Sequence, residues 1–441
     1  MTAMHIDIND ALSRGKPIER VRASDLPPST AEIQLAILGA PPAFQQTLLV
    51  GRPNVPNRDG FMSRIVSMLD SGWLTNHGPM VAEFEARVAQ IAKTRHCIAV
   101  SNGTAALELA VGALGMRGEV IVPSFTFVAT VHALRRQGIR PIFCDVDPET
   151  HCLDPDAVAA AITSETSGIL AVSLWGNHGA RERLHDIARQ RHLRLLYDSA
   201  HAFGCAPHVG AMADWCDAEV YSFHATKCIQ AIEGGAILTH DDLLASKLRL
   251  MSNFGFDGED RVEHLGTNGK MNEAEAAMGL SSLDAMDEIF AHNRENTRIY
   301  ADHLTDVPGI RLLERQNHQS HNHQYLVVEV DAAEAGLTRD EIVAALRLEN
   351  VVARRYFHPG AHRAEPYRSQ QPRAGANLPV TTALTERVMV LPNGLSIGAQ
   401  EVELLTERIR TMVTYAPAVR EALSRCRDER LGVFLRHTVQ G

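Results

Sequence analysis

The sequence has few cysteines and no long apolar segment, and both absences narrow the class of protein. Seven cysteines are scattered over 441 residues, an odd number without a CxxC pair, so we expect neither a disulfide framework nor a cysteine metal site. The apolar runs are too short for a membrane span, which needs roughly 18 residues. The amino terminus lacks the basic stretch and apolar run of a secretion signal, as MTAMHIDINDALSRGK shows, so we expect no secretion.

Positive charge is scarce as well. Lys and Arg number 43 against 53 Asp and Glu, a formal net charge of -10, which argues against a protein that coats nucleic acid.

No GxGxxG turn follows the first predicted strand of the sheet, so a dinucleotide-binding Rossmann protein loses its main support. With 45% hydrophobic and 22% charged residues, the chain is expected to be a globular cytoplasmic enzyme with a sizeable core. The interior cysteines are then small core residues in a reducing compartment: Cys144, Cys152, Cys205, Cys216 and Cys228.

Short apolar runs alternate with helical patterns through the middle of the chain. The predicted strands are residues 96–101, 119–124, 141–146, 167–176, 193–198, 218–223 and 234–240. The predicted helices among them are residues 104–114, 132–138, 154–162 and 181–192, and two more, 58–71 and 80–93, come before. This alternation is typical of the α/β class, with a mostly parallel sheet wrapped by helices.

The pattern changes after a long helical stretch at residues 271–298. Two further strands, 321–331 and 388–394, then accompany two helices, 338–351 and 399–412, which indicates a smaller α+β unit. We therefore predict an N-terminal extension at 1–38, a large domain at 39–289 and a small C-terminal domain at 290–441. An alternative boundary lies near Pro308.

Three predicted strands end in groups that suggest a ligand site, because open parallel sheets bind ligands outside the carboxyl ends of their strands. The first leads into SNGTAA, Ser101–Ala106, whose helix amino terminus suits a phosphate, although Ser and Asn are also ordinary helix caps. Another ends at Asp198, with His201 close behind, and a buried carboxylate is costly without a cation. A third carries Ser222 and is followed by Lys227, a residue type usually found on the surface.

These groups suit one cofactor far better together than any of them does alone. Pyridoxal 5'-phosphate (PLP) needs a lysine for its aldehyde, a carboxylate for its ring nitrogen, a helix amino terminus for its phosphate and a flat group against its ring. Lys227, Asp198, the Ser101–Thr104 turn with Ser222, and His201 supply these parts. The sequence therefore predicts a PLP site with Lys227 as the lysine that forms the Schiff base.

Five segments also resemble a known family, the PLP-dependent sugar aminotransferases of deoxysugar and aminocyclitol biosynthesis. They are SNGTAALELA, EVIVPSFTFVAT, YDSAHAFG, SFHATKCIQAIEGG and GTNGKMNEAEAAMGL. The resemblance extends over about residues 40–415 and implies fold type I, the fold of aspartate aminotransferase. It also implies a reaction in two halves, in which pyridoxamine phosphate carries the amino group from L-glutamate to a keto sugar.

The resemblance implies roles for individual residues around the cofactor ring. Lys227 would hold the aldehyde and then carry the proton between the cofactor and substrate carbons. Asp198 would pair with the ring nitrogen, His201 would stack on the ring, and Phe125 would lie near the opposite face. The intact Lys227 argues against the dehydratases of this family, which carry histidine there. The sequence departs from many members at Tyr197 and Ile232, neither of which has a part in the chemistry.

The resemblance also implies how the phosphate is held. Gly103, Thr104 and Ser222 would bind it within one subunit, and Asn268 would reach the phosphate of a neighbouring subunit's cofactor, with Lys270 as the alternative for that role. A homodimer with shared active sites is therefore expected.

Within the family, four segments are most similar to one branch, the dTDP-4-amino-4,6-dideoxy-D-glucose transaminases of the desosamine pathway. They are AFQQTLLVGRPN, SGWLTNHGP, HNHQYLVVEVD and RRYFHPGAHRAEPYR. The branch implies amination of C4 of dTDP-4-keto-6-deoxy-D-glucose. Candidate residues for the nucleotide sugar are Trp73, Thr75, Lys270, His323, Arg354 and Arg355, with Arg363 as a further cation.

Each of these side chains has an ordinary alternative, since Lys and Arg are usually solvated and a histidine beside a strand is usually packed. Three other functions also stay open. They are C3 amination of a keto sugar nucleotide, amination of a cyclitol, and a PLP-binding regulator without catalysis. The regulator is disfavoured by the intact lysine and by the lack of an appended DNA-binding segment.

Overall fold

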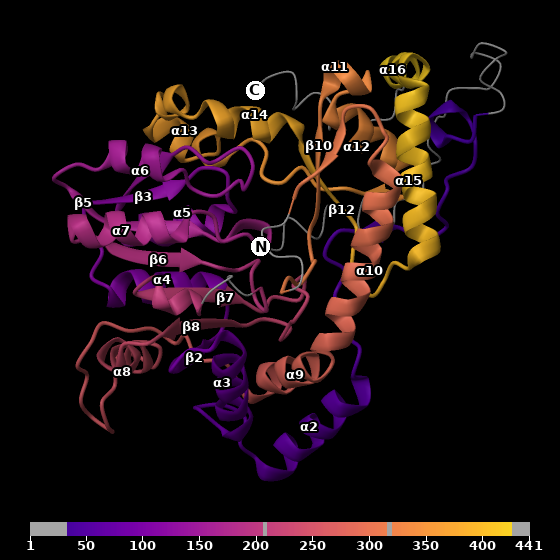
Figure 1. Cartoon of the computed structure of the whole chain (residues 1–441). Helices are drawn as coiled ribbons and strands as arrows, with labels where there is room; N and C mark the ends of the chain where they lie inside the picture. Colours follow the sequence, from indigo (N-terminus) through magenta and orange to yellow (C-terminus); the bar gives the residue numbers. More distant parts are fainter. Residues whose placement is uncertain (1–32, 206–209, 315–319, 426–441) are drawn as a thin grey trace.

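A seven-stranded sheet, on the left in Figure 1, forms the centre of the larger part of the protein. The structure is a computed structural model that describes residues 33–205, 210–314 and 320–425; the remainder of the predicted N-terminal extension and the end of the chain lie outside these ranges. The strands are β2 His96–Val100, β3 Glu119–Pro123, β4 Arg140–Cys144, β5 Thr166–Val172, β6 Arg194–Asp198, β7 Ala218–Ser222 and β8 Gly235–Thr239. Their order is β2-β8-β7-β6-β5-β3-β4, and only β8 runs antiparallel to its neighbours. The predicted mostly parallel α/β sheet is confirmed.

Helices cover the sheet, as the alternating pattern predicts. They are α3 Pro79–Ala92, α4 Gly103–Ala113, α5 Val128–Arg135, α6 Pro155–Ala161, α7 Arg181–Arg191 and α8 Asp242–Met251. The predicted helix before them, α2 Arg58–Ser71, packs mainly on a later helix, α9 Glu273–Asp284. The start of α4 is fixed by Asn102, whose side-chain oxygen accepts the Ala105 N–H at 2.9 Å, a typical N-cap. Helix α4 is apolar on most of its surface because it packs between the sheet and the neighbouring helices.

Several predicted boundaries differ from the structure, among them the strand expected at 321–331, which covers only Leu326–Val330. The helix expected at 132–138 begins earlier, at Val128, and the strand expected at 167–176 ends at Val172. The chain there turns through Leu174–Gly176, where Trp175 has φ 61°. An apolar run inside a buried turn looks like a strand, so periodicity alone could not separate the two.

A second, three-stranded antiparallel sheet follows in the sequence, in the order β12-β10-β9. Its strands are β9 Ile310–Leu312, β10 Leu326–Val330 and β12 Val388–Leu391. The helical stretch expected at 271–298 divides at Ala285 into α9 Glu273–Asp284 and α10 Met286–Leu304. The remaining helices are α11 Ala332–Ala335, α12 Arg339–Leu348, α13 Tyr367–Gln370, α14 Pro379–Arg387, α15 Ala399–Thr414 and α16 Ala416–Arg425.

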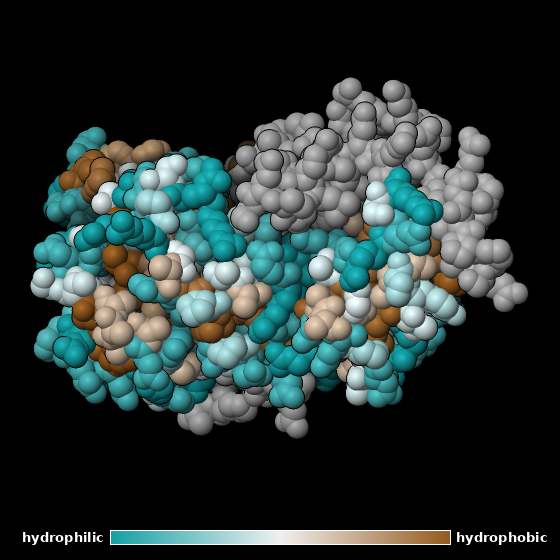
Figure 2. All heavy atoms as spheres, turned by 90° about the horizontal axis from the view of Figure 1, so that it is seen from above, coloured by the Kyte–Doolittle hydropathy of each residue, from teal (hydrophilic) through white to brown (hydrophobic). Residues whose placement is uncertain are grey.

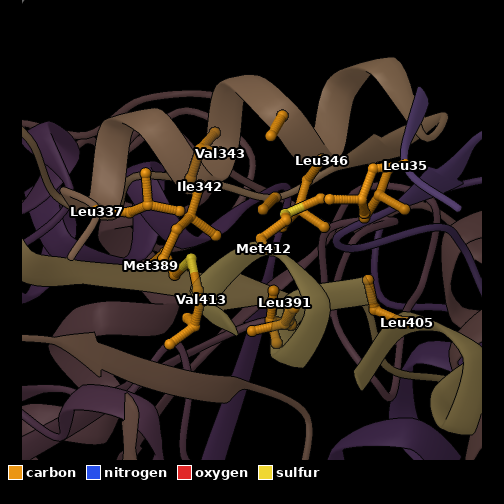
Figure 3. Close-up of a cluster of buried hydrophobic side chains, with 14 of the residues drawn as sticks. Leu35, Leu337, Ile342, Val343, Leu346, Met389, Leu391, Leu405, Met412 and Val413 are labelled. Carbon is orange, nitrogen blue, oxygen red and sulfur yellow. The ribbon is translucent and has the colours of Figure 1, made fainter. Parts of the chain in front are cut away.

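The second sheet has its own hydrophobic core, and residues from early in the chain take part in it. Leu35 packs there beside Leu346 and Met412 (Figure 3). Strand β1, Leu48–Leu49, pairs in parallel with β11, Val351–Val352. The first described residues thus pack against the C-terminal part, while the limits 39–289 and 290–441 stay a prediction.

The described residues include no helix that is both long and apolar enough to cross a membrane. The face in Figure 2 mixes hydrophilic residues with small groups of hydrophobic ones. Four of the five cysteines predicted as core residues are buried, and Cys216 is partly buried.

Candidate active site

Lys227 lies in the loop between β7 and β8, at the carboxyl edge of the sheet. Backbone bonds hold this loop: the Phe223 N–H donates to the Gly234 carbonyl, and the Ala231 N–H donates back to Phe223, both at 2.8 Å. The Lys227 ammonium donates to the Tyr325 hydroxyl at 3.1 Å. Burial lowers the pKa of Lys227 to about 8, with the charge of Asp198 acting against this shift. A lysine with this pKa is a neutral nucleophile for an appreciable fraction of the time near neutral pH.

Asp198 is the last residue of β6 and is buried. One of its oxygens, Oδ2, accepts the Thr130 hydroxyl at 2.7 Å, and Oδ1 accepts the Ala200 N–H at 3.1 Å. Burial raises the pKa of Asp198, while these two bonds and the charge of Lys227 favour the carboxylate. A cationic ring nitrogen placed here would hold the carboxylate ionised.

His201 follows β6 and belongs to an aromatic cluster. Its ring stacks on Trp175, with centroids 5.5 Å apart and planes at 26°, and lies 4.1 Å from the Tyr325 ring. Burial and the charge of Lys227 lower the pKa of His201 well below its usual value, so the imidazole is neutral. Phe125 is fully buried, and its ring meets those of Trp175 and Phe357 edge-on, with ring centroids 6.4 and 5.9 Å apart. His201 and Phe125 thus share neighbours, while Lys227 is in contact with Tyr325.

The amino terminus of α4 lies against the end of β7. A Cβ built on Gly103 would be 3.0 Å from the Ser222 Cβ, and one on Gly235 would be 2.5 Å from the Asn102 backbone. Glycine is needed for such a close approach. Gly103 and Thr104 are the first residues of the helix, whose N–H groups lack intrahelical acceptors. The turn and the Ser222 hydroxyl therefore form a cradle of a kind that suits a phosphate.

Asn268 and Lys270 lie in a segment beside this cradle. The Ser101 N–H donates to the Gly269 carbonyl at 2.7 Å. Asn268 is exposed, whereas the Lys270 ammonium donates to the Asn253 side chain at 2.6 Å and lies 4.9 Å from the Phe254 ring centroid.

Trp73 and Thr75 lie in the exposed loop between α2 and α3. The Trp73 indole N–H donates to the Thr75 carbonyl at 2.7 Å. Among the contacts of the described residues, none joins either residue to Lys227. One subunit alone does not bring these two predicted residues to the lysine.

The remaining predicted substrate residues lie in the C-terminal part. His323 is buried, and the next residue, Gln324, donates to the Thr226 carbonyl at 2.7 Å, so this segment runs beside the Lys227 loop. The Arg354 guanidinium lies 5.5 Å from the Tyr356 ring, which stacks on Phe357 at 4.9 Å.

The other two arginines have carboxylate partners. Arg355 pairs with Asp340 at 3.2 Å, and Arg363 pairs with Glu386 at 3.3 Å. Arg354 contacts the aromatic cluster through the Tyr356 ring.

Sequence reasoning missed four residues of this site: Thr130, Trp175, Tyr325 and Phe357. Thr130 and Tyr325 lie inside the quoted segments EVIVPSFTFVAT and HNHQYLVVEVD. A polar hydroxyl within an apolar motif is a signal that could have found them. Trp175 gave no such signal, because it lies in an apolar run.

The arrangement could hold PLP, and comparison with known proteins agrees. The model of the DegT/DnrJ/EryC1/StrS aminotransferase family matches residues 57–410. A dTDP-4-amino-4,6-dideoxy-D-glucose transaminase from Shigella dysenteriae is 33% identical over 83% of this chain and 99% of its own length. A GDP-perosamine synthase from Vibrio cholerae is 29% identical over 80% of this chain and 97% of its own.

Among solved structures, DesI, crystallised in the presence of its TDP-sugar product, is 47% identical to this chain. The similarity covers 90% of this chain and 100% of DesI, with a TM-score of 0.85. The neighbours share fold type I, which confirms the predicted fold. The chain therefore belongs to the DegT/DnrJ/EryC1/StrS aminotransferase family, whose members are PLP-dependent enzymes.

Proposed function

We propose that this aminotransferase moves the amino group of L-glutamate to C4 of dTDP-4-keto-6-deoxy-D-glucose, giving dTDP-4-amino-4,6-dideoxy-D-glucose. The observation that carries the proposal is the similarity to DesI, 47% identity over 90% of the chain. The product of DesI is a TDP-sugar, and the name of the Shigella dysenteriae enzyme, dTDP-4-amino-4,6-dideoxy-D-glucose transaminase, supports an amine at C4. The enzyme would act in the biosynthesis of a deoxyaminosugar for an antibiotic or a glycan.

PLP would occupy the carboxyl edge of the seven-stranded sheet. When bound, it supplies an aldehyde that takes up amino groups and a ring that draws electrons from the neighbouring carbon. Asp198 would keep the ring nitrogen protonated, and the Thr130 hydroxyl, 2.7 Å from Asp198, orients this carboxylate. Gly103, Thr104 and Ser222 would bind the phosphate. His201, neutral and stacked in the aromatic cluster, would lie flat against the ring.

Lys227 would anchor the cofactor and then act as the base. With glutamate bound, the neutral Lys227 amine would accept the Cα proton and carry it across to the cofactor side of the site. The pKa of about 8 suits both roles, because near neutral pH a much larger fraction of this amine is unprotonated than of a solvated lysine with its usual pKa. The Tyr325 hydroxyl, 3.1 Å away, holds the amine in place between steps.

The two phosphates of the nucleotide sugar would need local cations in this acidic chain. Arg354 is the best placed, because it contacts the aromatic cluster through Tyr356. The proposed substrate-binding set is the predicted one: Trp73, Thr75, Lys270, His323, Arg354 and Arg355.

A homodimer would complete the site. Asn268 is exposed next to the phosphate cradle of its own subunit. Large apolar side chains are exposed in the same segment and in the loop between α2 and α3: Phe254 is 48%, Leu265 93% and Trp73 51% exposed. A neighbouring subunit that covers these side chains would bring Asn268 of one subunit to the phosphate of the cofactor that the other subunit binds. Light scattering should give twice the 48.3 kDa chain mass. A monomer with full activity would contradict shared sites.

The decisive experiment is a visible absorption spectrum of the purified protein with PLP. Glutamate should bleach the band of the lysine-bound cofactor, and dTDP-4-keto-6-deoxy-D-glucose should restore it. NMR of the product should place the new amine at C4. Bleaching without recovery would leave an aminotransferase with another acceptor, and a protein without any band would overturn the proposal.

A second candidate is amination of a GDP-linked keto sugar, favoured by the match to the GDP-perosamine synthase. The same titration, repeated with GDP-4-keto-6-deoxy-D-mannose, separates the two acceptors. An amine at C3 in the product would indicate a C3 aminotransferase instead.

A further inference from the structure

A buried chain of hydrogen bonds runs from the second sheet to the aromatic cluster of the active site. Glu329, on β10, lies 3.2 Å from His151 Nε2, and the Trp175 indole nitrogen lies 3.1 Å from His151 Nδ1. Glu329, His151 and Trp175 are 5%, 1% and 2% exposed. Buried polar groups are normally placed with their partners, so the contacts are structural features of the fold.

The direction of each bond follows from the chemistry of the groups. An indole N–H only donates, so His151 Nδ1 must accept. The imidazole proton is then on Nε2 and is donated to Glu329. Two arginines keep this carboxylate ionised and in place: Arg311 at 2.6 Å and Arg387 at 2.7 Å. The indole N–H and the anchored carboxylate together thus fix the tautomer of a buried histidine.

Trp175, held by its hydrogen bond to His151, contacts the candidate site through its ring. Its ring stacks on His201 at 5.5 Å and on Phe357 at 5.3 Å, with planes at 26° and 11°. The residue has φ 61°, in the left-handed region, so its backbone needs support from its surroundings. The indole N–H bond to His151 supplies such support and sets the rotation of the ring against His201.

We propose that His151 and Glu329 are positioning residues, which act through Trp175 to hold the His201 ring in the orientation that receives the cofactor. The inference rests on the proposed function, in which His201 faces the PLP ring. Neither residue belongs to the predicted site, and each acts only through a neighbour.

The test uses H151F, W175F and the double variant. H151F keeps a buried ring but removes both hydrogen bonds, and Glu329 keeps its two arginines. W175F keeps a stacking ring but lacks the N–H. We expect each single variant to bind PLP about tenfold more weakly and to lose about 10- to 100-fold in kcat, with the KM for the sugar changed less than about threefold. The double variant should be no more impaired than the more impaired single variant, because both single variants lose the same bond between Trp175 and His151.

A matched control is H185F. His185 is also bonded to a tryptophan, since its Nδ1 lies 3.0 Å from the Trp215 carbonyl oxygen and the rings meet edge-on at 5.6 Å. H185F should retain wild-type PLP affinity and kcat. Losses of H151F and W175F that multiply in the double variant would overturn the proposal, as would an H151F enzyme with wild-type constants.

A readout without cofactor separates this inference from the proposed function. Near-ultraviolet circular dichroism of the cofactor-free wild type and W175F gives, by difference, the signal of Trp175. This signal should be weaker in H151F and unchanged in H185F. Unchanged dichroism in H151F would refute the positioning role even if the protein proved to bind no PLP. Should H151F fail to fold, H151L gives the same comparison, because a smaller apolar side chain at this position also removes both hydrogen bonds.

Discussion

The Lys227 ammonium lies in a site that disfavours its charge, and replacing Lys227 by methionine should therefore stabilise the cofactor-free protein. Methionine keeps a long unbranched side chain in the same space but has no charge to desolvate. The Tyr325 hydroxyl loses its partner in this variant, which offsets a small part of the gain. An active-site lysine that costs stability is the expected result of a site built for chemistry.

The size of the effect follows from the pKa. A fall from 10.5 to about 8 corresponds to about 3 kcal/mol at 1.36 kcal/mol for each pKa unit. Below pH 8 the amine is charged in both the folded and the unfolded chain, so the full cost is present. Between pH 8 and 10.5 the folded protein releases the proton first, and the cost disappears. The stability gap between K227M and wild type should therefore shrink as the pH rises through this window.

Calorimetry of both cofactor-free proteins at pH 7, 8.5 and 10 would measure the gap. With about 2.1 cal/mol/K for each residue, 3 kcal/mol in a chain of 441 residues raises the Tm by about 3 °C. K247M is a suitable control, because the Lys247 ammonium donates to the Ala113 carbonyl on α4, in another part of the protein. A K227M protein that is less stable than wild type at pH 7, or a gap that widens with pH, would refute the burial of a charged amine.

Three further predictions concern the holoenzyme. K227A should bind PLP but lose the visible band of the lysine-bound cofactor and at least about 10⁴-fold in kcat; a single-turnover assay would detect any retained activity, which would exclude Lys227 as the base. D198N should keep PLP bound but lose about 10² to 10⁴ in kcat, because an amide cannot hold the ring nitrogen protonated; kcat within about threefold of wild type would remove Asp198 from this role. G103A places a Cβ 3.0 Å from the Ser222 Cβ and should weaken PLP binding at least about tenfold in a fluorescence titration, and unaltered affinity would show that the phosphate lies elsewhere.

The large sheet could be predicted from the sequence because its signals are local. Each strand is a short apolar run, and the helices between them carry caps such as Asn102. The prediction of a strand through Trp175 was wrong, because the chain turns there. Trp175 is buried by contacts with Phe357 and His201, which are distant in sequence. The break at Ala285 in the 271–298 stretch was also missed, because Ala and Met favour helix on both sides of it.

The candidate site likewise contains residues that the sequence could predict and residues that it could not. Asp198, Ser222 and the Gly103 turn each end a strand or begin a helix of one sheet, so topology alone brings them to one edge. Tyr325 and Thr130 reach Lys227 and Asp198 through tertiary contacts, which periodicity does not reveal. Trp73 and Thr75, expected in the sugar pocket, lie in the exposed loop between α2 and α3, so their part in the site depends on a neighbouring subunit in the proposed dimer.

The C-terminal part of the chain supplies side chains that orient the reactive groups of the seven-stranded sheet. Lysine, carboxylate and phosphate cradle all come from the seven-stranded sheet, whereas Tyr325, Phe357 and Glu329 come from the C-terminal part. Of these, Tyr325 sets the position of the Lys227 amine, and Glu329 sets that of His201 through His151 and Trp175. The reactive groups are therefore oriented by a part of the chain that provides none of them. Substitutions in the C-terminal part that leave both sheets folded should lower kcat more than they weaken PLP binding, because the cradle and Asp198 stay intact.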